Sequence, residues 1–172
     1  MAKPVIGILA LQGDFALHVK SVKRLGMESR LVRDAETLQQ CSALILPGGF
    51  GAAKNLCDFA VNGPDCEVDE GVAALVRAVH EQGKPVAAVC IAPALLAKVL
   101  GDEGPELTIG TDAETAGALA KMGVSHVECP VTEFVVDRDR KLITSPAYML
   151  AQSISEAAEG IEKTVAALIE MA

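Results

Sequence analysis

The stretch that decides the fold is Lys84-Pro-Val-Ala-Ala-Val-Cys-Ile-Ala-Pro-Ala-Leu-Leu96. Its first part, Pro85 to Val89, is a short apolar run typical of a buried strand. A helix-forming run follows, with a proline near its first turn, where the missing N–H does no harm. The residues two before and two after the cysteine are small, Ala88 and Ala92, as a tight turn requires. The pattern predicts a strand–turn–helix elbow that lifts Cys90 above a parallel sheet as a nucleophile.

The position of Cys90 also predicts its reactivity. A cysteine at this turn faces a helix N-terminus, whose partial positive charge lowers the pKa of a thiol and favours the thiolate. The alternative is a buried core thiol, because free cysteine is among the most buried residue types.

Composition favours one α/β domain over residues 1–172. Hydrophobic residues make up 51% of the chain and aromatic residues only 3%, so Ala, Val, Leu and Ile must form the core. This composition is typical of a parallel sheet covered by helices. The net charge of −8, with no basic run, argues against a nucleic-acid partner.

Apolar runs shorter than about 20 residues predict no membrane span. The N-terminus shows no signal-peptide pattern, and the five cysteines form no CxxC pair. We therefore expect reduced thiols in a cytoplasmic protein, with neither a disulfide framework nor a metal site.

Apolar runs and helical spacing give the expected order of elements along the chain. Strands are expected at 4–11, 28–32, 43–46, 85–89 and 107–111, with a hairpin at 134–144, and helices at 15–25, 69–82, 92–100, 112–122 and 151–171. A short capped turn of helix is expected at 34–38. This order predicts a flavodoxin-like, doubly wound, mainly parallel sheet with helices on both faces.

Glycines follow the third predicted strand, in the loop Pro47-Gly-Gly-Phe-Gly51. Ligands of open α/β sheets bind outside the carboxyl ends of the strands. The backbone N–H groups of Gly48 and Gly49, together with that of Ile91, are therefore candidates for an oxyanion hole beside Cys90. A plain strand-to-helix turn would explain the glycines equally well.

Asp14 follows the first predicted strand and is the candidate acid/base partner of Cys90, because that strand is expected to end beside the elbow strand. It is also a candidate helix N-cap, and both roles can hold together. The histidines, His18, His80 and His126, are expected to be solvated or packed, since none shows the spacing to a carboxylate that orients a base.

From Leu44 onward the sequence resembles the ElbB-like family, isoprenoid-biosynthesis-associated glyoxalases of the ThiJ/PfpI group in the class I glutamine amidotransferase-like superfamily. The resemblance spans about three quarters of the chain, and the runs that carry it are residues 46–56, 83–85, 90–94, 107–112 and 144–152. The first ~45 residues, through Ile6-Gly-Ile-Leu-Ala-Leu-Gln-Gly-Asp14 and Arg24-Leu-Gly26, instead resemble PdxT, the glutaminase subunit of pyridoxal 5′-phosphate synthase. The two resemblances together suggest a chimera, natural or engineered.

The ElbB-like resemblance implies a cofactor-independent glyoxalase, a lyase that converts small dicarbonyls such as glyoxal to glycolate with Cys90 as nucleophile. A glutamate of that family contacts the cysteine, and Asp14, one methylene shorter, stands at its position. No metal is implied.

Two alternatives stay open. One is a catalytically impaired or engineered flavodoxin-like scaffold, favoured by the shorter acid at position 14. The other is a glutaminase subunit, which the sequence disfavours: the PdxT pattern Glu-Ser after Pro-Gly-Gly is replaced by Phe50-Gly51, and a C-terminal His-Pro-Glu segment is missing. The apolar helix faces are compatible with a homodimer.

Overall fold

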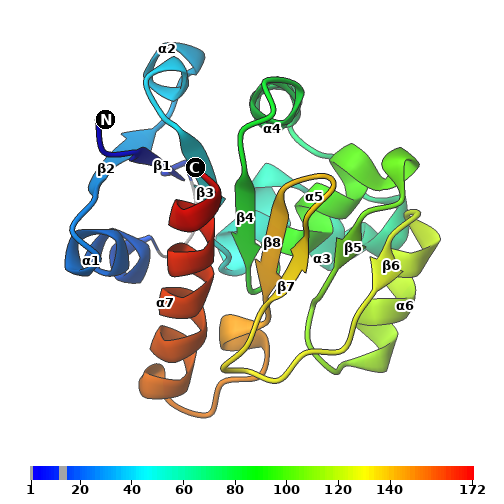
Figure 1. The fold of residues 1–172 in the computed structure, drawn as a ribbon. Coiled ribbons are helices and arrows are strands. Elements are labelled where there is room, and N and C mark those ends of the chain that lie inside the picture. The colour runs from blue at the N-terminus through cyan, green and yellow to red at the C-terminus, as the bar shows by residue number, and fades with distance from the viewer. Residues whose placement is uncertain (1, 12–14) are drawn as a thin grey trace.

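The structure is a computed structural model and describes residues 2–11 and 15–172. Strands and helices alternate through most of the chain (Figure 1). The strands are β1 (Val5–Leu9), β2 (Glu28–Val32), β3 (Ala43–Leu46), β4 (Val86–Val89), β5 (Glu106–Leu107), β6 (Ser125–His126), β7 (Val135–Asp137) and β8 (Leu142–Ser145). The α-helices are α1 (Ala16–Arg24), α2 (Ala35–Gln39), α3 (Phe59–Asn62), α4 (Glu70–Glu81), α5 (Ala92–Leu100), α6 (Ala113–Lys121) and α7 (Ile154–Met171). Single turns of other helix types lie at Ala52–Leu56, Gly63–Asp65, Gly101–Glu103 and Ala147–Met149.

The main sheet has the strand order β2-β1-β3-β4-β8-β7. Every neighbouring pair is parallel except β7 and β8, which form the antiparallel hairpin expected at 134–144. The strands β2-β1-β3-β4-β8 follow the flavodoxin-like order, in which the chain winds outward in both directions from a switch point between β1 and β3. The predicted fold class is therefore confirmed. β5 and β6 form a separate parallel pair.

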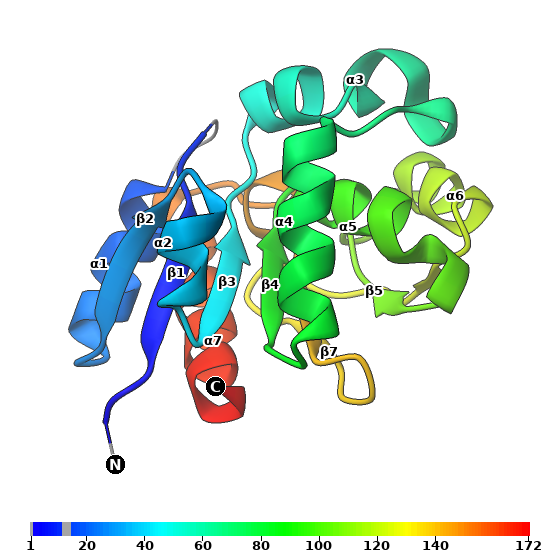
Figure 2. The same ribbon diagram turned by 90° about the horizontal axis from the view of Figure 1, so that it is seen from above.

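Alternate residues of each central strand face opposite layers of helices, as the two-residue period of a strand requires. On one face, Ile8, Ile45 and Val89 pack with α1 and α7. On the other face, Leu44 and Ala88 pack with α2, α4 and α5. Figure 1 shows α7 along the front of the sheet, and Figure 2 shows α2 and α4 lying over the strands. Both faces of β3 and β4 are buried, which explains why their sequences are continuous apolar runs.

Side-chain caps start several helices where the sequence predicts them. The carboxylates of Asp34, Asp69 and Asp112 accept hydrogen bonds from backbone N–H groups three residues later, and Ser153 caps α7 in the same way. These caps satisfy N–H groups that have no partner within the helix. The four helices consequently begin within a few residues of the predicted positions.

Three expectations differ from the structure. The strand expected at 107–111 is only two residues long, because the N–H groups of Thr108 and Ile109 donate to the side chains of Thr144 and His126 and not to a neighbouring strand. The first helix begins at Ala16 with Phe15 at its N-cap position, where Asp14 is the expected cap, and Phe15 makes no side-chain cap. Finally, β3 lies between β1 and β4, so the first strand does not neighbour the elbow strand. Their ends are two strand spacings apart, about 10 Å.

Candidate functional site

Cys90 occupies the predicted elbow between β4 and α5. Its φ of 60° is in the left-handed region, which a non-glycine residue rarely adopts and which costs about 1–3 kcal/mol. The surrounding structure holds it there: the Cys90 N–H donates to the Ser145 carbonyl at 3.0 Å, which extends the β4–β8 ladder by one bond. α5 then begins at Ala92 and is almost entirely buried, so the elbow is fixed on both sides.

The Cys90 thiol is surrounded by backbone donors although it is only 7% exposed. Burial raises its pKa, while interactions with the backbone N–H groups of Gly49, Ile91 and Met149 act in the opposite direction without cancelling that effect. The expectation of a lowered pKa is therefore wrong, because desolvation of the buried sulfur outweighs the effect of the nearby helix N-terminus. The sulfur therefore lies among groups that can stabilise a negative charge, while its burial favours the neutral thiol.

Gly48 is the residue that makes room for Cys90. A Cβ at Gly48 would lie 2.4 Å from the Cys90 Cβ and 2.7 Å from the Val89 carbonyl oxygen, far inside ordinary contact distance. The neighbouring Gly49 has a φ of 106°, which an L side chain rarely adopts. The two glycines thus allow the loop after β3 to lie directly against the elbow.

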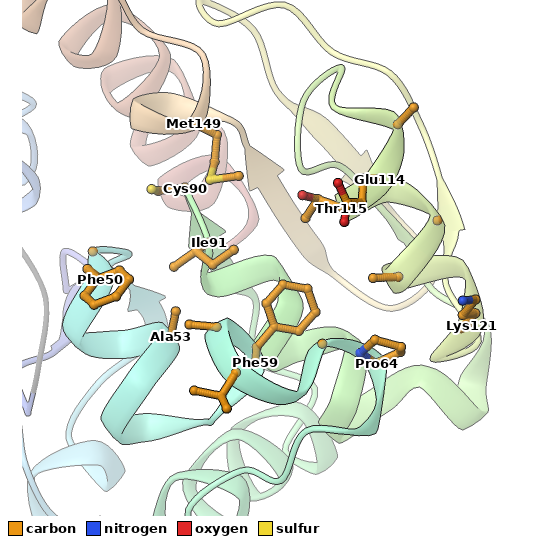
Figure 3. Close-up of a pocket in the computed structure, with 17 residues that line it drawn as sticks. Phe50, Ala53, Phe59, Pro64, Cys90, Ile91, Glu114, Thr115, Lys121 and Met149 are labelled. Atoms are coloured by element: carbon orange, nitrogen blue, oxygen red, sulfur yellow. The ribbon is translucent and has the colours of Figure 1, made fainter.

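Two cavities share Cys90 in their lining, and Figure 3 shows the larger of them. The smaller, of about 300 Å³, is lined by Cys90 together with Gly48, Gly49, Phe50 and Tyr148. The larger, of about 790 Å³, extends from Cys90 between α3 and α6. Its lining is mainly apolar and includes Phe59, Pro64, Ile91, Ala118 and Met149, with the charged groups Glu114 and Lys121 on α6. The sulfur is therefore buried but accessible to a small molecule.

The sequence does not predict that Met149 and helix α6 line the cavity at Cys90. Met149 reaches Cys90 because Ala147, which directly follows the β8–Pro146 bend, has a φ of 42° and starts a tight helical turn. No general rule predicts a left-handed alanine from sequence. The one sequence feature that points to Met149 is the run 144–152, which resembles the ElbB-like family but by itself indicates no function for these residues.

Neither His80 nor His126 reaches this site. His80 pairs with Glu103 at 3.0 Å, and the His126 Nε2 accepts a hydrogen bond from the Ile109 N–H at 3.2 Å. Neither lines the two cavities that contain Cys90. His18 is buried in α1. In the described part of the chain, no cluster of three or more metal-ligating side chains is found.

Asp14, the predicted acid/base residue, lies outside the described residues. Its role as partner of Cys90 remains a prediction.

A comparison with family models identifies the chain. The model of the SNO glutamine amidotransferase family matches residues 8–111, more than half of the chain, and the matched range includes both the glycine loop and Cys90. The chain belongs to the SNO glutamine amidotransferase family. This match also includes residue 44, where the two sequence resemblances meet. The comparisons therefore lend no support to a chimeric origin of this family member.

Named relatives of this chain include two mitochondrial proteins and the PdxT subunits of pyridoxal 5′-phosphate synthase. The human glutamine amidotransferase-like class 1 domain-containing protein 3, mitochondrial, is 41% identical over 138 residues, which are 75% of this chain and 51% of that protein. The rat ES1 protein homolog, mitochondrial, is 40% identical over the same shares. The PdxT subunit of pyridoxal 5′-phosphate synthase from Caldicellulosiruptor bescii is 29% identical over 161 residues, 91% of this chain and 77% of that protein. The chain spans about half the length of the mitochondrial relatives.

Solved structures confirm the fold of this family member. An isoprenoid biosynthesis protein with an amidotransferase-like domain from Ehrlichia chaffeensis superposes with a TM-score of 0.78 at 22% identity, over 96% of this chain and 98% of that one. Drosophila melanogaster DJ-1beta superposes over the whole of both chains, with a TM-score of 0.61 at 22% identity. These likenesses establish a class I glutamine amidotransferase-like fold.

Among the helices of the described residues, none is long and apolar enough to cross a bilayer. Two relatives are mitochondrial by name, so the cytoplasmic location expected from sequence stays a prediction.

Proposed function

We propose that this protein is a cofactor-independent glyoxalase-type enzyme that converts small dicarbonyls, such as glyoxal, to hydroxy acids through Cys90. The observation that carries the proposal is the sulfur of Cys90, held at a strained elbow beside three backbone N–H groups and open to two cavities. A structural thiol needs neither the strain nor the access.

The proposed reaction balances without a redox cofactor. The Cys90 thiol loses its proton to a base, and the sulfur adds to one aldehyde carbon of glyoxal to give a hemithioacetal. Removal of the C–H proton from that carbon, and return of a proton to the neighbouring carbon, converts the adduct to a thioester of glycolate. Water then cleaves the thioester, releasing glycolate and the thiol. The sum is glyoxal plus water to glycolate.

Backbone groups and one acid have roles in these steps. The N–H groups of Gly48, Gly49 and Ile91 are proposed to stabilise the oxyanion that forms when the sulfur adds. Since Cys90 rests as a thiol, a base is required, and Asp14 is proposed for it. Replacing Asp14 with Glu tests whether the length of this side chain limits activity. A rise in kcat/KM would indicate that residue 14 acts as the acid/base group and that aspartate is too short for full activity, which is also the basis of the impaired-scaffold alternative.

Membership of an amidotransferase family favours glutamine hydrolysis as a second candidate function. The site argues against it, because neither His80 nor His126 lines the cavities at Cys90. A glutaminase cysteine needs a base that accepts its proton and returns it to leaving ammonia.

Product analysis separates the two functions. The purified protein is incubated with glyoxal and, separately, with glutamine, while glycolate is followed by proton NMR and ammonia by a coupled enzyme assay. We expect glycolate without ammonia. Ammonia release from glutamine, with no glycolate formed above the buffer rate, would overturn the proposal in favour of the glutaminase.

A further inference from the structure

The larger cavity at Cys90 is much too large for glyoxal. Glyoxal has about the volume of three or four water molecules, roughly 100 Å³. The smaller cavity, of about 300 Å³, already accommodates it beside the sulfur. The larger cavity, of about 790 Å³, is in the range of sites that bind drug-sized molecules.

Small residues on one face of α6 create this extra space. Ala113, Gly117 and Lys121 follow at intervals of four residues, so they share the helix face that lines the cavity, and Ala118 lies beside them. A Cβ built on Gly117 would have no heavy atom within 4 Å. Gly117 itself is exposed, so the cavity is open to solvent at the middle of α6, and a larger side chain at position 117 would extend into this open part of the cavity.

The lining also indicates the chemistry of the occupant. Between Cys90 and α6 the cavity presents Phe59, Pro64 and Ile91, which are apolar. Its charged groups are Glu114 in the first turn of α6 and Lys121 at its last residue, about 10 Å apart along the helix. Figure 3 shows Lys121 on the opposite side of the cavity from Cys90, with Phe59 and Pro64 along its lower edge. Since the two charges have opposite signs and lie at separate ends, the middle of the cavity favours a neutral apolar group.

We infer that the substrate of this site is an extended 2-oxoaldehyde, whose carbonyl groups lie at Cys90 and whose neutral apolar body fills the cavity as far as the Gly117 face of α6. The inference rests on the proposed function for the reacting group, while the apolar subsite is a property of the cavity itself.

A homologous series of substrates tests the inference by turnover. We measure kcat/KM for straight-chain 2-oxoaldehydes from methylglyoxal to 2-oxooctanal. Each methylene that becomes buried should raise kcat/KM about fourfold until the cavity is filled. In Gly117→Leu, the ratio of kcat/KM for 2-oxooctanal to that for methylglyoxal should fall roughly tenfold, because the new side chain occupies the space of about two methylenes. Gly117→Ala, the matched control, should retain most of that ratio. A protein that consumes glyoxal with kcat/KM independent of chain length would overturn the inference and leave the proposed function intact.

A binding experiment tests the subsite without turnover. Cys90→Ser protein, labelled with ¹⁵N, is titrated with 2-octanone, which has the apolar body and no aldehyde. Saturable shifts of the amide signals of Gly117 and Ala118 would support the subsite, provided that the Ala118 shift is lost in the double variant Cys90→Ser, Gly117→Leu. This result would stand even if the wild type consumed no 2-oxoaldehyde, in which case only the proposed function would fail. Unperturbed α6 signals at saturating 2-octanone would overturn the inference.

Discussion

Replacing Gly48 with Ala should damage both the stability and the site of this protein. The added Cβ would lie 2.4 Å from the Cys90 Cβ and 2.7 Å from the Val89 carbonyl oxygen, more than 0.5 Å inside ordinary contact. Both neighbours are fixed to the backbone, so no rotamer change relieves the overlap, and β3 and the elbow must separate. Such overpacking costs about 1–3 kcal/mol, which corresponds to a fall in Tm of roughly 2–12 °C for a chain of this size.

The same separation should reduce activity, because a displacement of about 1 Å at a reacting group costs on the order of a hundredfold in rate. Differential scanning calorimetry gives Tm, and glycolate formation gives kcat/KM per folded molecule. Gly117→Ala is the matched control for Tm, since its Cβ meets no heavy atom within 4 Å and alanine stabilises a helix by about 1 kcal/mol relative to glycine. If Gly48→Ala had the Tm and the kcat/KM of the wild type, the close approach of the glycine loop to Cys90 would be refuted.

Three further outcomes are expected. Because burial raises the pKa of the Cys90 thiol, kcat/KM for glyoxal should still be rising above pH 8.5 in a pH–rate profile, and a plateau below pH 7 would contradict this. Burial raises the pKa of the Cys66 and Cys129 thiols to about 11, with a smaller contribution from the Cys57 thiol for Cys66 and from the Glu133 carboxylate for Cys129. As the pH rises, the unfolded state therefore loses these protons before the folded state does. The free energy of unfolding, measured by urea titration, should be fully retained below pH 8.5 and decline as the pH rises toward 11. The buried carboxylate of Asp137 accepts hydrogen bonds from the backbone N–H groups of Glu106 and Arg140 and from the Arg140 guanidinium, whose side chain is 31% exposed. Because Asp137→Ala leaves these donors unpaired, it should cost about 1–3 kcal/mol in urea unfolding, while the exposed Asp139→Ala stays within about 0.5 kcal/mol. Equal effects of the two changes would count against a structural role for the Asp137 hydrogen bonds.

The fold could be predicted largely because local signals agree with it. The run Ala43–Leu46 is bounded as expected, and the caps at Asp69 and Asp112 start α4 and α6. The elbow was predictable because a small–x–Cys–x–small pattern between an apolar run and a helix has few other solutions. Each of these features depends on residues adjacent in the chain.

The rest of the site depends on contacts between distant segments. Met149 contacts the sulfur of Cys90 only because β8 pairs with β4 and the chain then turns at Ala147. The raised pKa of Cys90 follows from its burial under several elements, which no local pattern records. The cavity wall at Gly117 likewise arises from the packing of α6 across from α3. In each case the sequence supplies the residue, and only the assembled fold supplies its neighbours.

The most direct test of the account is glycolate formation from glyoxal by Cys90→Ser, compared with the wild type and with Cys129→Ser. Cys129 is a buried thiol that lines neither cavity at the elbow, so its variant controls for the loss of a cysteine as such. We expect Cys90→Ser to lose at least about a thousandfold in kcat, as enzymes do without their nucleophile, and Cys129→Ser to remain active. Wild-type turnover by Cys90→Ser would contradict the account.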